Sequence, residues 1–171
     1  MLSGLPSMRW ITLGASDEPR FEVSAVTLPA GRRAFGSAVI GGTAYLVGGL
    51  ADGFERVEEC LEFDLATGEF RQFPAPRAPR ISPELVALDG RLYLIGGASA
   101  QGGDGSGSDT SIEVYDPTTR SWSVWTEEFG LEPAHLRAFA HQGRLLLVST
   151  QFPDPAAIEL LWLDPTQGSQ P

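Results

Sequence analysis

Short apolar runs separated by glycine-containing pairs dominate the hydrophobic pattern of the chain. Residues 37–49 read SAVIGGTAYLVGG, and residues 85–97 read LVALDGRLYLIGG. In each segment two apolar runs flank an X-Gly pair, which is typical of a tight β-hairpin because glycine tolerates a positive φ. The second run is almost continuously apolar, which predicts a strand covered on both faces.

The two segments are copies of one repeat. Tyr45 aligns with Tyr93, and the pair Gly48 and Gly49 aligns with Gly96 and Gly97, all at an offset of 48 residues. A third copy, AFAHQGRLLLVST, lies 53 residues further on and lacks the tyrosine and the glycine pair. We expect the paired glycines to let the backbone pass where a Cβ would clash.

A second block follows each copy and predicts a turn and a further strand. FDLATGEF at 63–70 aligns with YDPTTRSW at 115–122, and LDPTQGSQ at 163–170 is the third copy. The aspartate-led segment turns the chain. An aromatic residue then starts a fourth strand, and its ring is available to pack on the neighbouring repeat. The aligned positions are Asp64 with Asp116 and Phe70 with Trp122, and Tyr115 ends the third strand of the second copy.

These blocks predict an all-β chain with four antiparallel strands in each repeat of about 50 residues. We assign 37–74 to a first repeat, 83–126 to a second and 136–168 to a degenerate third. Residues 21–36 are interpreted as the last strand of a preceding or shared blade. Residues 1–20 are an N-terminal segment in which 8–13 is a candidate extra strand.

The combined pattern resembles the kelch repeat. Tyr115 lies 18 residues after the glycine pair, and Trp122 follows Asp116 by six residues. Arg33 and Arg80 precede their hairpin glycines by nine and ten residues, near where kelch repeats often carry an arginine. The resemblance covers residues 21–168 and implies a kelch-type β-propeller built from four-stranded blades.

The predicted number of blades is about three, whereas propellers close with roughly four to eight. Two arrangements remain open. Two copies of this half propeller form a dimeric six-bladed ring, with each N-terminal strand completing the other copy's last blade. Alternatively, the sequence is a fragment of a longer kelch protein. An open arc would leave two apolar blade faces in water, and such patches mark association.

Charge and cysteine content narrow the function classes. The net charge is −10 and the 12 basic residues form no basic stripe, so we expect neither nucleic-acid binding nor an anionic membrane surface as partner. Cys60 is the single cysteine, which excludes an internal disulfide and a cysteine-based zinc site. The N-terminal residues lack a signal-peptide pattern, and no apolar run approaches the roughly 18 residues of a membrane span. We therefore expect a cytoplasmic protein.

The glycine-rich run at 96–111 contains a D-x-S-x-S pattern at Asp104, Ser106 and Ser108, which resembles the metal site of von Willebrand A-type domains. Its context is a β-repeat rich in glycine, so we interpret it as a flexible loop between two strands. No lysine or helix follows that would complete a phosphate cradle. The two histidines, His135 and His141, belong to no ligand cluster. We predict no metal, no cofactor and no catalytic residue.

Arginines on or near the connections between blades are the main candidate binding residues: Arg32, Arg33, Arg77, Arg80 and Arg137. Such connections gather on one face of a propeller, where the guanidinium groups would bind an acidic peptide or carboxylate. The alternative is that each arginine pairs with a nearby acidic residue. Loops 50–57 and 98–110 are the variable connections within blades, and Phe54 and Arg56 in the first are candidate contacts unless Phe54 packs in the core.

The favoured function is a non-catalytic binding module that presents its loops to a protein or peptide partner. The alternative is an enzyme or sugar-binding propeller whose axial pocket is completed by missing blades or a second copy. Copper-radical oxidases, which also use a kelch-like propeller, need a Tyr cross-linked to Cys, a second Tyr and two His. The sequence shows no such set, because Tyr45 and Tyr93 are repeat positions and Cys60 starts a strand.

Overall fold

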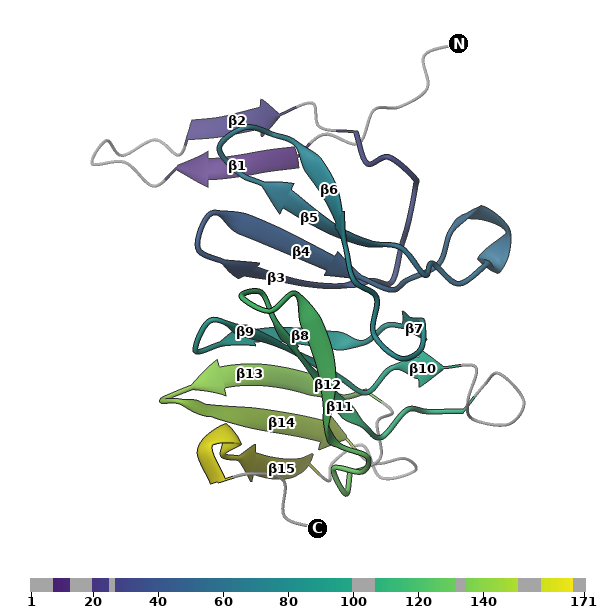
Figure 1. The fold of residues 1–171 in the computed structure, drawn as a ribbon, viewed down its shortest axis with the longest axis vertical. Helices are drawn as coiled ribbons and strands as arrows, with labels where there is room; N and C mark the ends of the chain where they lie inside the picture. The colour runs from purple at the N-terminus through teal and green to yellow at the C-terminus, as the bar shows by residue number, and fades with distance from the viewer. Residues whose placement is uncertain are drawn as a thin grey trace. The chain divides into compact units, whose positions relative to one another are not determined.

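The structure, a computed structural model, describes residues 8–12, 20–24, 27–99, 107–131, 135–150 and 158–167 (Figure 1). The chain forms two compact units, residues 1–31 and residues 32–171. The described residues form strands, two 3₁₀ turns and no α-helix, which confirms the all-β prediction. No helix among them has the length and apolar character needed to cross a membrane.

The first unit contains one antiparallel hairpin. Strand β1 (Met8–Thr12) pairs with β2 (Arg20–Ser24), with Met8 opposite Ser24 and Thr12 opposite Arg20. The candidate extra strand at 8–13 and the start of the strand expected at 21–28 are therefore both present. The assignment of β2 to a preceding or shared blade stays a prediction.

The second unit contains three antiparallel sheets in which the strands lie in sequence order. The first sheet consists of β3 (Gly36–Ile40), β4 (Thr43–Val47), β5 (Cys60–Asp64) and β6 (Phe70–Phe73). The second sheet consists of β8 (Glu84–Leu88), β9 (Arg91–Ile95), β11 (Ile112–Asp116) and β12 (Ser121–Thr126). The third sheet consists of β13 (Arg137–His141), β14 (Arg144–Thr150) and β15 (Ile158–Leu163). The four-stranded antiparallel sheets confirm the expected kelch-type blades.

Shorter elements lie in the connections. Strand β7 (Arg80–Ile81) pairs with β10 (Ala98–Ser99), which ties the connection before the second sheet to a loop within that sheet. The 3₁₀ turn η1 (Asp52–Phe54) lies between β4 and β5, and η2 (Pro165–Gln167) follows β15.

The tight turns follow from local chemistry. Asp89 and Gly90, between β8 and β9, both have positive φ, as a type I′ hairpin turn requires. After β11, the Asp116 Oδ1 accepts hydrogen bonds from the backbone N–H of Thr118 at 2.9 Å and from its hydroxyl at 2.6 Å. Asp164 makes the same two contacts after β15, so this aspartate turn recurs in the third sheet.

The glycine pairs lie where two backbones meet. Gly48 has φ +70°, and a Cβ there would lie 2.2 Å from the carbonyl oxygen of Arg80. Gly97 has φ +89°, and its Cβ would lie 2.9 Å from the carbonyl oxygen of Ile81. The predicted steric reason for these glycines is therefore confirmed, because no residue with a side chain fits without moving the backbone.

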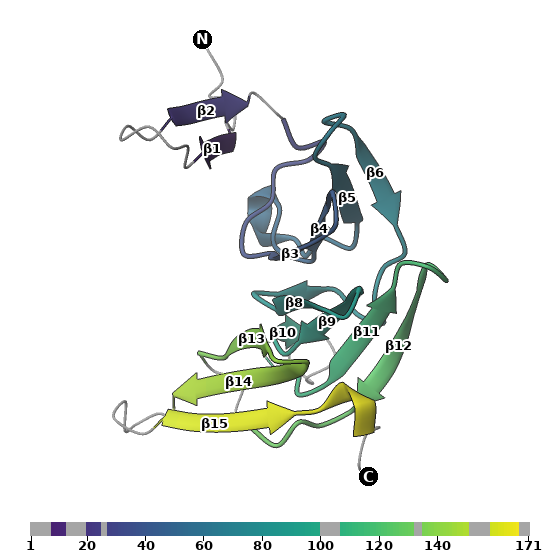
Figure 2. The same ribbon diagram turned by 90° about the vertical axis from the view of Figure 1, so that its left-hand side faces the viewer.

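The three sheets pack side by side through their faces, with the innermost strand β8 next to both β3 and β13 (Figure 2). One apolar core lies between the first and second sheets and another between the second and third. The first core includes Tyr45, Val47, Cys60 and Phe73 against Leu85, Leu92, Leu94 and Tyr115. The second core includes Val86, Tyr93, Ile95 and Ile112 against Ala138, Leu145 and Leu147.

Trp122 links two neighbouring sheets, as its repeat position predicts. Its ring stacks with that of Phe73 at a centroid distance of 6.4 Å. Its Nε1 donates a hydrogen bond to the carbonyl oxygen of Pro74 at 2.7 Å. The aromatic residue that starts β12 therefore packs on the preceding sheet and satisfies its polar atom there.

Candidate binding face

Loops and connections of the second unit emerge at the same ends of the strands, and we call this surface the loop face (Figure 1). Antiparallel alternation explains it, because each sheet is entered at this end and its second and third strands are joined there. The described segments of the loop face are 32–35, 48–59, 74–83, 96–99, 107–111, 127–131 and 135–136.

Arg80 is buried on the loop face. Its guanidinium pairs with the carboxylate of Glu113 on β11 and lies 3.2 Å from the carboxylate of Asp109. It also donates to the carbonyl oxygens of Gly96 at 3.1 Å and Ser111 at 3.2 Å. These contacts fasten the connection before the second sheet to that sheet. They correct the expectation that Arg80 presents its guanidinium to a ligand.

Arg32, and not Arg33, is the structural counterpart of Arg80 in the first sheet. The Arg32 side chain is fully buried, donates to the carbonyl oxygen of Glu59 at 2.7 Å and pairs with the Glu59 carboxylate at 3.1 Å. Burial lowers the pKa of the Arg32 guanidinium, and the charge of Glu59 opposes that shift. The sequence comparison, which placed Arg33 beside Arg80, was wrong by one residue.

Arg77 and Arg137 are more exposed, and each pairs with a different acidic residue. Arg77 binds both carboxylate oxygens of Glu127 at 2.9 Å, and this bond raises the pKa of the Arg77 guanidinium. Arg137 pairs with Glu84 at 3.2 Å. Four of the five predicted arginines therefore have acidic partners of their own, which is the arrangement expected of structural pairs rather than of one guanidinium cluster.

Phe54 projects from the loop face and is 76% exposed. Its backbone has φ +65°, which is unusual for a bulky residue. The loop around it is held by a hydrogen bond from the N–H of Ala51 to the carbonyl of Glu55 at 2.8 Å. The Arg33 guanidinium lies 4.8 Å from the centre of the Phe54 ring, in a cation–π contact. The half-buried Arg56 pairs in a β-bridge with Leu50 at the base of this loop.

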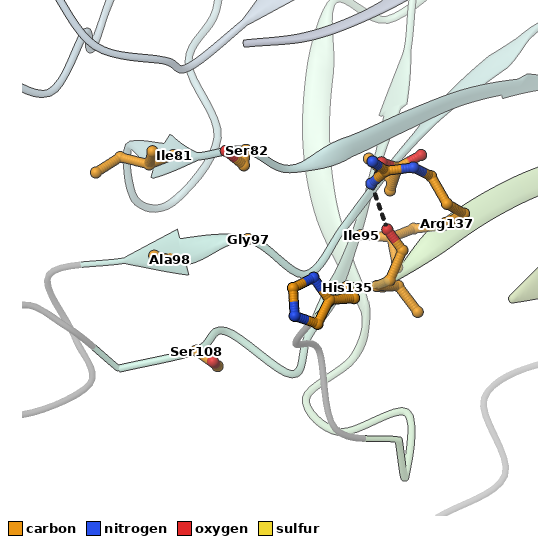
Figure 3. A pocket seen from close by; sticks show the side chains of 10 residues that line it. Ile81, Ser82, Ile95, Gly97, Ala98, Ser108, His135 and Arg137 are labelled. Carbon is orange, nitrogen blue, oxygen red and sulfur yellow. Dashed lines mark hydrogen bonds and ion pairs between the residues drawn. The ribbon is translucent and has the colours of Figure 1, made fainter. Parts of the chain in front are cut away.

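A pocket of about 370 Å³ opens on the loop face between the second and third sheets. Figure 3 shows Ser82, Ser108, His135 and Arg137 around it, and Glu84 completes its charged wall. Ser82 and His135 both have positive φ, as does Ala34 at the aligned position before the first sheet. Each connection thus enters its innermost strand through the same strained residue, and two of the three line the pocket.

Other candidate chemistry is absent from the part of the chain that the structure describes. Burial raises the pKa of the Cys60 thiol to about 11, so it is protonated and a poor nucleophile at neutral pH. No group of three or more His, Cys, Asp or Glu side chains in the described ranges is arranged to hold a metal ion. Asp104 and Ser106 of the D-x-S-x-S pattern lie outside the described residues.

Sequence reasoning missed Glu113, the main partner of Arg80. The repeat alignment contains a signal for it. Glu113 occupies the position taken by Leu61 in β5 and Leu161 in β15, both inside the sheets. An acidic residue where equivalent strands carry leucine indicates a buried carboxylate, which requires a cationic partner.

Comparison with known proteins agrees with these sheets. The Kelch motif matches residues 79–124, the segment that builds the second sheet. The human kelch repeat and BTB domain-containing protein 13 is 34% identical over 102 residues, which is 59% of this chain and 21% of that protein. An F-box/kelch-repeat protein of Arabidopsis thaliana is 33% identical over 100 residues, which is 58% of this chain and 34% of that protein. The matches thus span a fifth to a third of these relatives. Together with the antiparallel sheets, they show that the chain belongs to the kelch-repeat family.

Proposed function

We propose that the chain is a protein-interaction module that binds a protein or peptide partner on its loop face. The exposed Phe54 ring, with the Arg33 guanidinium against it, is the observation that carries this proposal. Aromatic and arginine side chains dominate the binding energy of protein interfaces. The relatives named above are kelch-repeat proteins with an F-box or a BTB domain, and this family supports an interaction role.

Preorganisation of the Phe54 loop supports the same role. The loop closes on itself through the bond from Ala51 to Glu55, and the Val57 N–H donates to the carbonyl of Gly49 at 3.0 Å. A ring held in a strained conformation and left in water contributes little to folding. A partner that covers it gains apolar burial without first ordering the loop.

The proposal is tested by selecting displayed random peptides on the immobilised chain and measuring the affinity of the enriched sequences. Phe54→Ala should weaken binding by about tenfold or more, and Arg33→Ala should weaken it to a smaller extent. Val124→Ala on β12 is the matched control, because Val124 is an exposed apolar residue outside the loop face. Peptides that bind the Phe54→Ala variant as tightly as the parent would place the binding site elsewhere.

The pocket between the second and third sheets favours a second candidate, a small polar ligand such as a sugar. Its volume of about 370 Å³ lies within the range of small-molecule sites. The hydroxyls of Ser82 and Ser108 and the ring of His135 would supply polar contacts. Titration calorimetry with mono- and disaccharides tests this candidate. Binding that is lost in His135→Ala and kept in Phe54→Ala would separate it from the peptide site.

A further inference from the structure

The third sheet has one apolar face in water. The register places Phe139, Leu146 and Trp162 in one row across β13, β14 and β15, with Val148 and Leu160 in an adjacent row. Residues that face each other in this register share one face of the sheet. Four of its side chains, Phe139, Ile158, Leu160 and Trp162, are between 42% and 62% exposed. We call this surface the outward face.

The outward face is built from interface positions of the repeat. Phe139 and Val148 align with Val86 and Ile95 of the second sheet at the offset of 53 residues. In the second sheet both aligned residues are buried, because the third sheet packs against them. The outward face therefore carries the apolar side chains that elsewhere in the chain form a sheet-to-sheet core.

A head-to-tail partner would need a free complementary face on another copy. The only aligned candidate among the described residues is on the first sheet, where Leu46 and Phe63 correspond to Leu94 and Tyr115. Leu46, Leu61 and Phe63 are buried, at most 9% exposed. That face is therefore closed, and the outward face is the exposed apolar sheet face of the described chain.

We propose that the outward face docks against the same face of a second copy of this chain, related by a two-fold axis. Such an isologous contact needs only one patch per molecule, and it closes at two copies. It differs from the six-bladed ring, in which unlike ends of the two copies would meet. The proposal does not depend on the loop face.

The size of the face predicts a weak dimer. Three strands of about six residues cover about 14 by 20 Å, or roughly 300 Å² per copy, from the usual strand spacing and rise. A stable interface buries about 800 Å² per partner, so we expect dissociation in the micromolar range or weaker. Each copy carries a net charge of −10, so added salt should strengthen the dimer by screening the repulsion.

Sedimentation velocity of the full chain, over concentrations that bracket the micromolar range, tests the proposal. We expect a monomer–dimer equilibrium that stops at two copies. Leu160→Glu should weaken it by about tenfold or more, because it buries a charge in the contact. Val124→Glu is the matched control and should leave the equilibrium unchanged, since Val124 is an exposed apolar residue on the second sheet. Ile158→Lys is a second variant, and circular dichroism confirms that each variant is folded.

Three outcomes would overturn the proposal. The first is a monomer at every concentration, and the second is a Leu160→Glu variant that dimerises as the parent does. The third is a series of oligomers that lengthens with concentration, since unlike faces then meet. A mixing experiment separates the two geometries. Tagged Leu160→Glu should bind the parent chain at least about tenfold more weakly than tagged parent does. Equal binding would indicate a head-to-tail contact.

Discussion

Replacing Arg80 with alanine removes the cation at the centre of the second sheet's buried network. The Arg80 side chain is fully buried, and it contacts the carboxylates of Glu113 and Asp109, which are themselves 2% and 9% exposed. In the variant, both carboxylates would remain in the protein interior without that cation. Two backbone carbonyls, those of Gly96 and Ser111, would lose a hydrogen bond as well.

The expected loss of unfolding free energy is about 3–5 kcal/mol, the usual cost of removing one partner of a buried ion pair. A domain of this size is stable by roughly 5–15 kcal/mol, so the variant would be close to unfolding. The cost arises from the orphaned carboxylates, so removing one of them should restore stability. Arg80→Met combined with Glu113→Leu should recover part of the loss, because leucine is the residue at this position in β5 and β15.

Urea unfolding followed by tryptophan fluorescence measures these differences. Arg91→Ala is the control, because Arg91 also pairs with an aspartate at 3.2 Å but is 55% exposed. An exposed pair of this kind contributes about 0–1 kcal/mol. If Arg80→Ala lost no more than Arg91→Ala, the network would not fasten the connection to the second sheet, and the argument from burial would fail.

Three further predictions concern the repeat positions. Gly48→Ala should lose at least about 2 kcal/mol through its positive φ and a Cβ 2.2 Å from a backbone carbonyl, whereas Gly42→Ala, with open space around it, should change stability by under about 0.5 kcal/mol in the same urea assay. Trp122→Ala should cost about 2–3 kcal/mol, below the value for a fully buried ring because Trp122 is half-buried, and an unchanged unfolding midpoint would contradict its role between the sheets. Hydrogen bonds from the side chain and backbone of Thr118 lower the pKa of the Asp116 carboxyl from 3.8, so its contribution to stability is full above that value and is lost as the pH falls through the lower folded value. Asp116→Asn should therefore lower the melting temperature at pH 7, with a difference that narrows in acid, and a difference independent of pH would argue against the charged hydrogen bond.

Local chemistry made much of the fold predictable. The turn at Asp89 and Gly90, the aspartate turn at Asp116 and the glycine at 48 each depend on residues a few positions apart or on a steric requirement that recurs with the repeat. The position of Trp122 on the neighbouring sheet also followed from its place in the repeat. Such features could be predicted because the same short pattern appears more than once in the chain.

The candidate site was less predictable. The sequence placed five arginines near the loop face but did not separate the buried Arg32 and Arg80 from the exposed Arg137. Two adjacent arginines, Arg32 and Arg33, fit the repeat almost equally well. Which of them points inward depends on Glu59, which is 27 residues away from Arg32. The exposure of Phe54 was likewise left open by the sequence.

The sequence by itself determined the repeat, the hairpins and turns, the order of the strands and the kelch relationship, because these depend on the spacing of residue types along the chain. The tertiary structure decided which arginines became internal fasteners, which aromatic ring stayed in water and which sheet face was left uncovered. Those outcomes depend on burial and on pairing between distant segments, where one carboxylate such as Glu113 or one neighbouring sheet changes the fate of a side chain. The same kind of arginine or apolar residue therefore stabilises the fold at one position and is available to a partner at another.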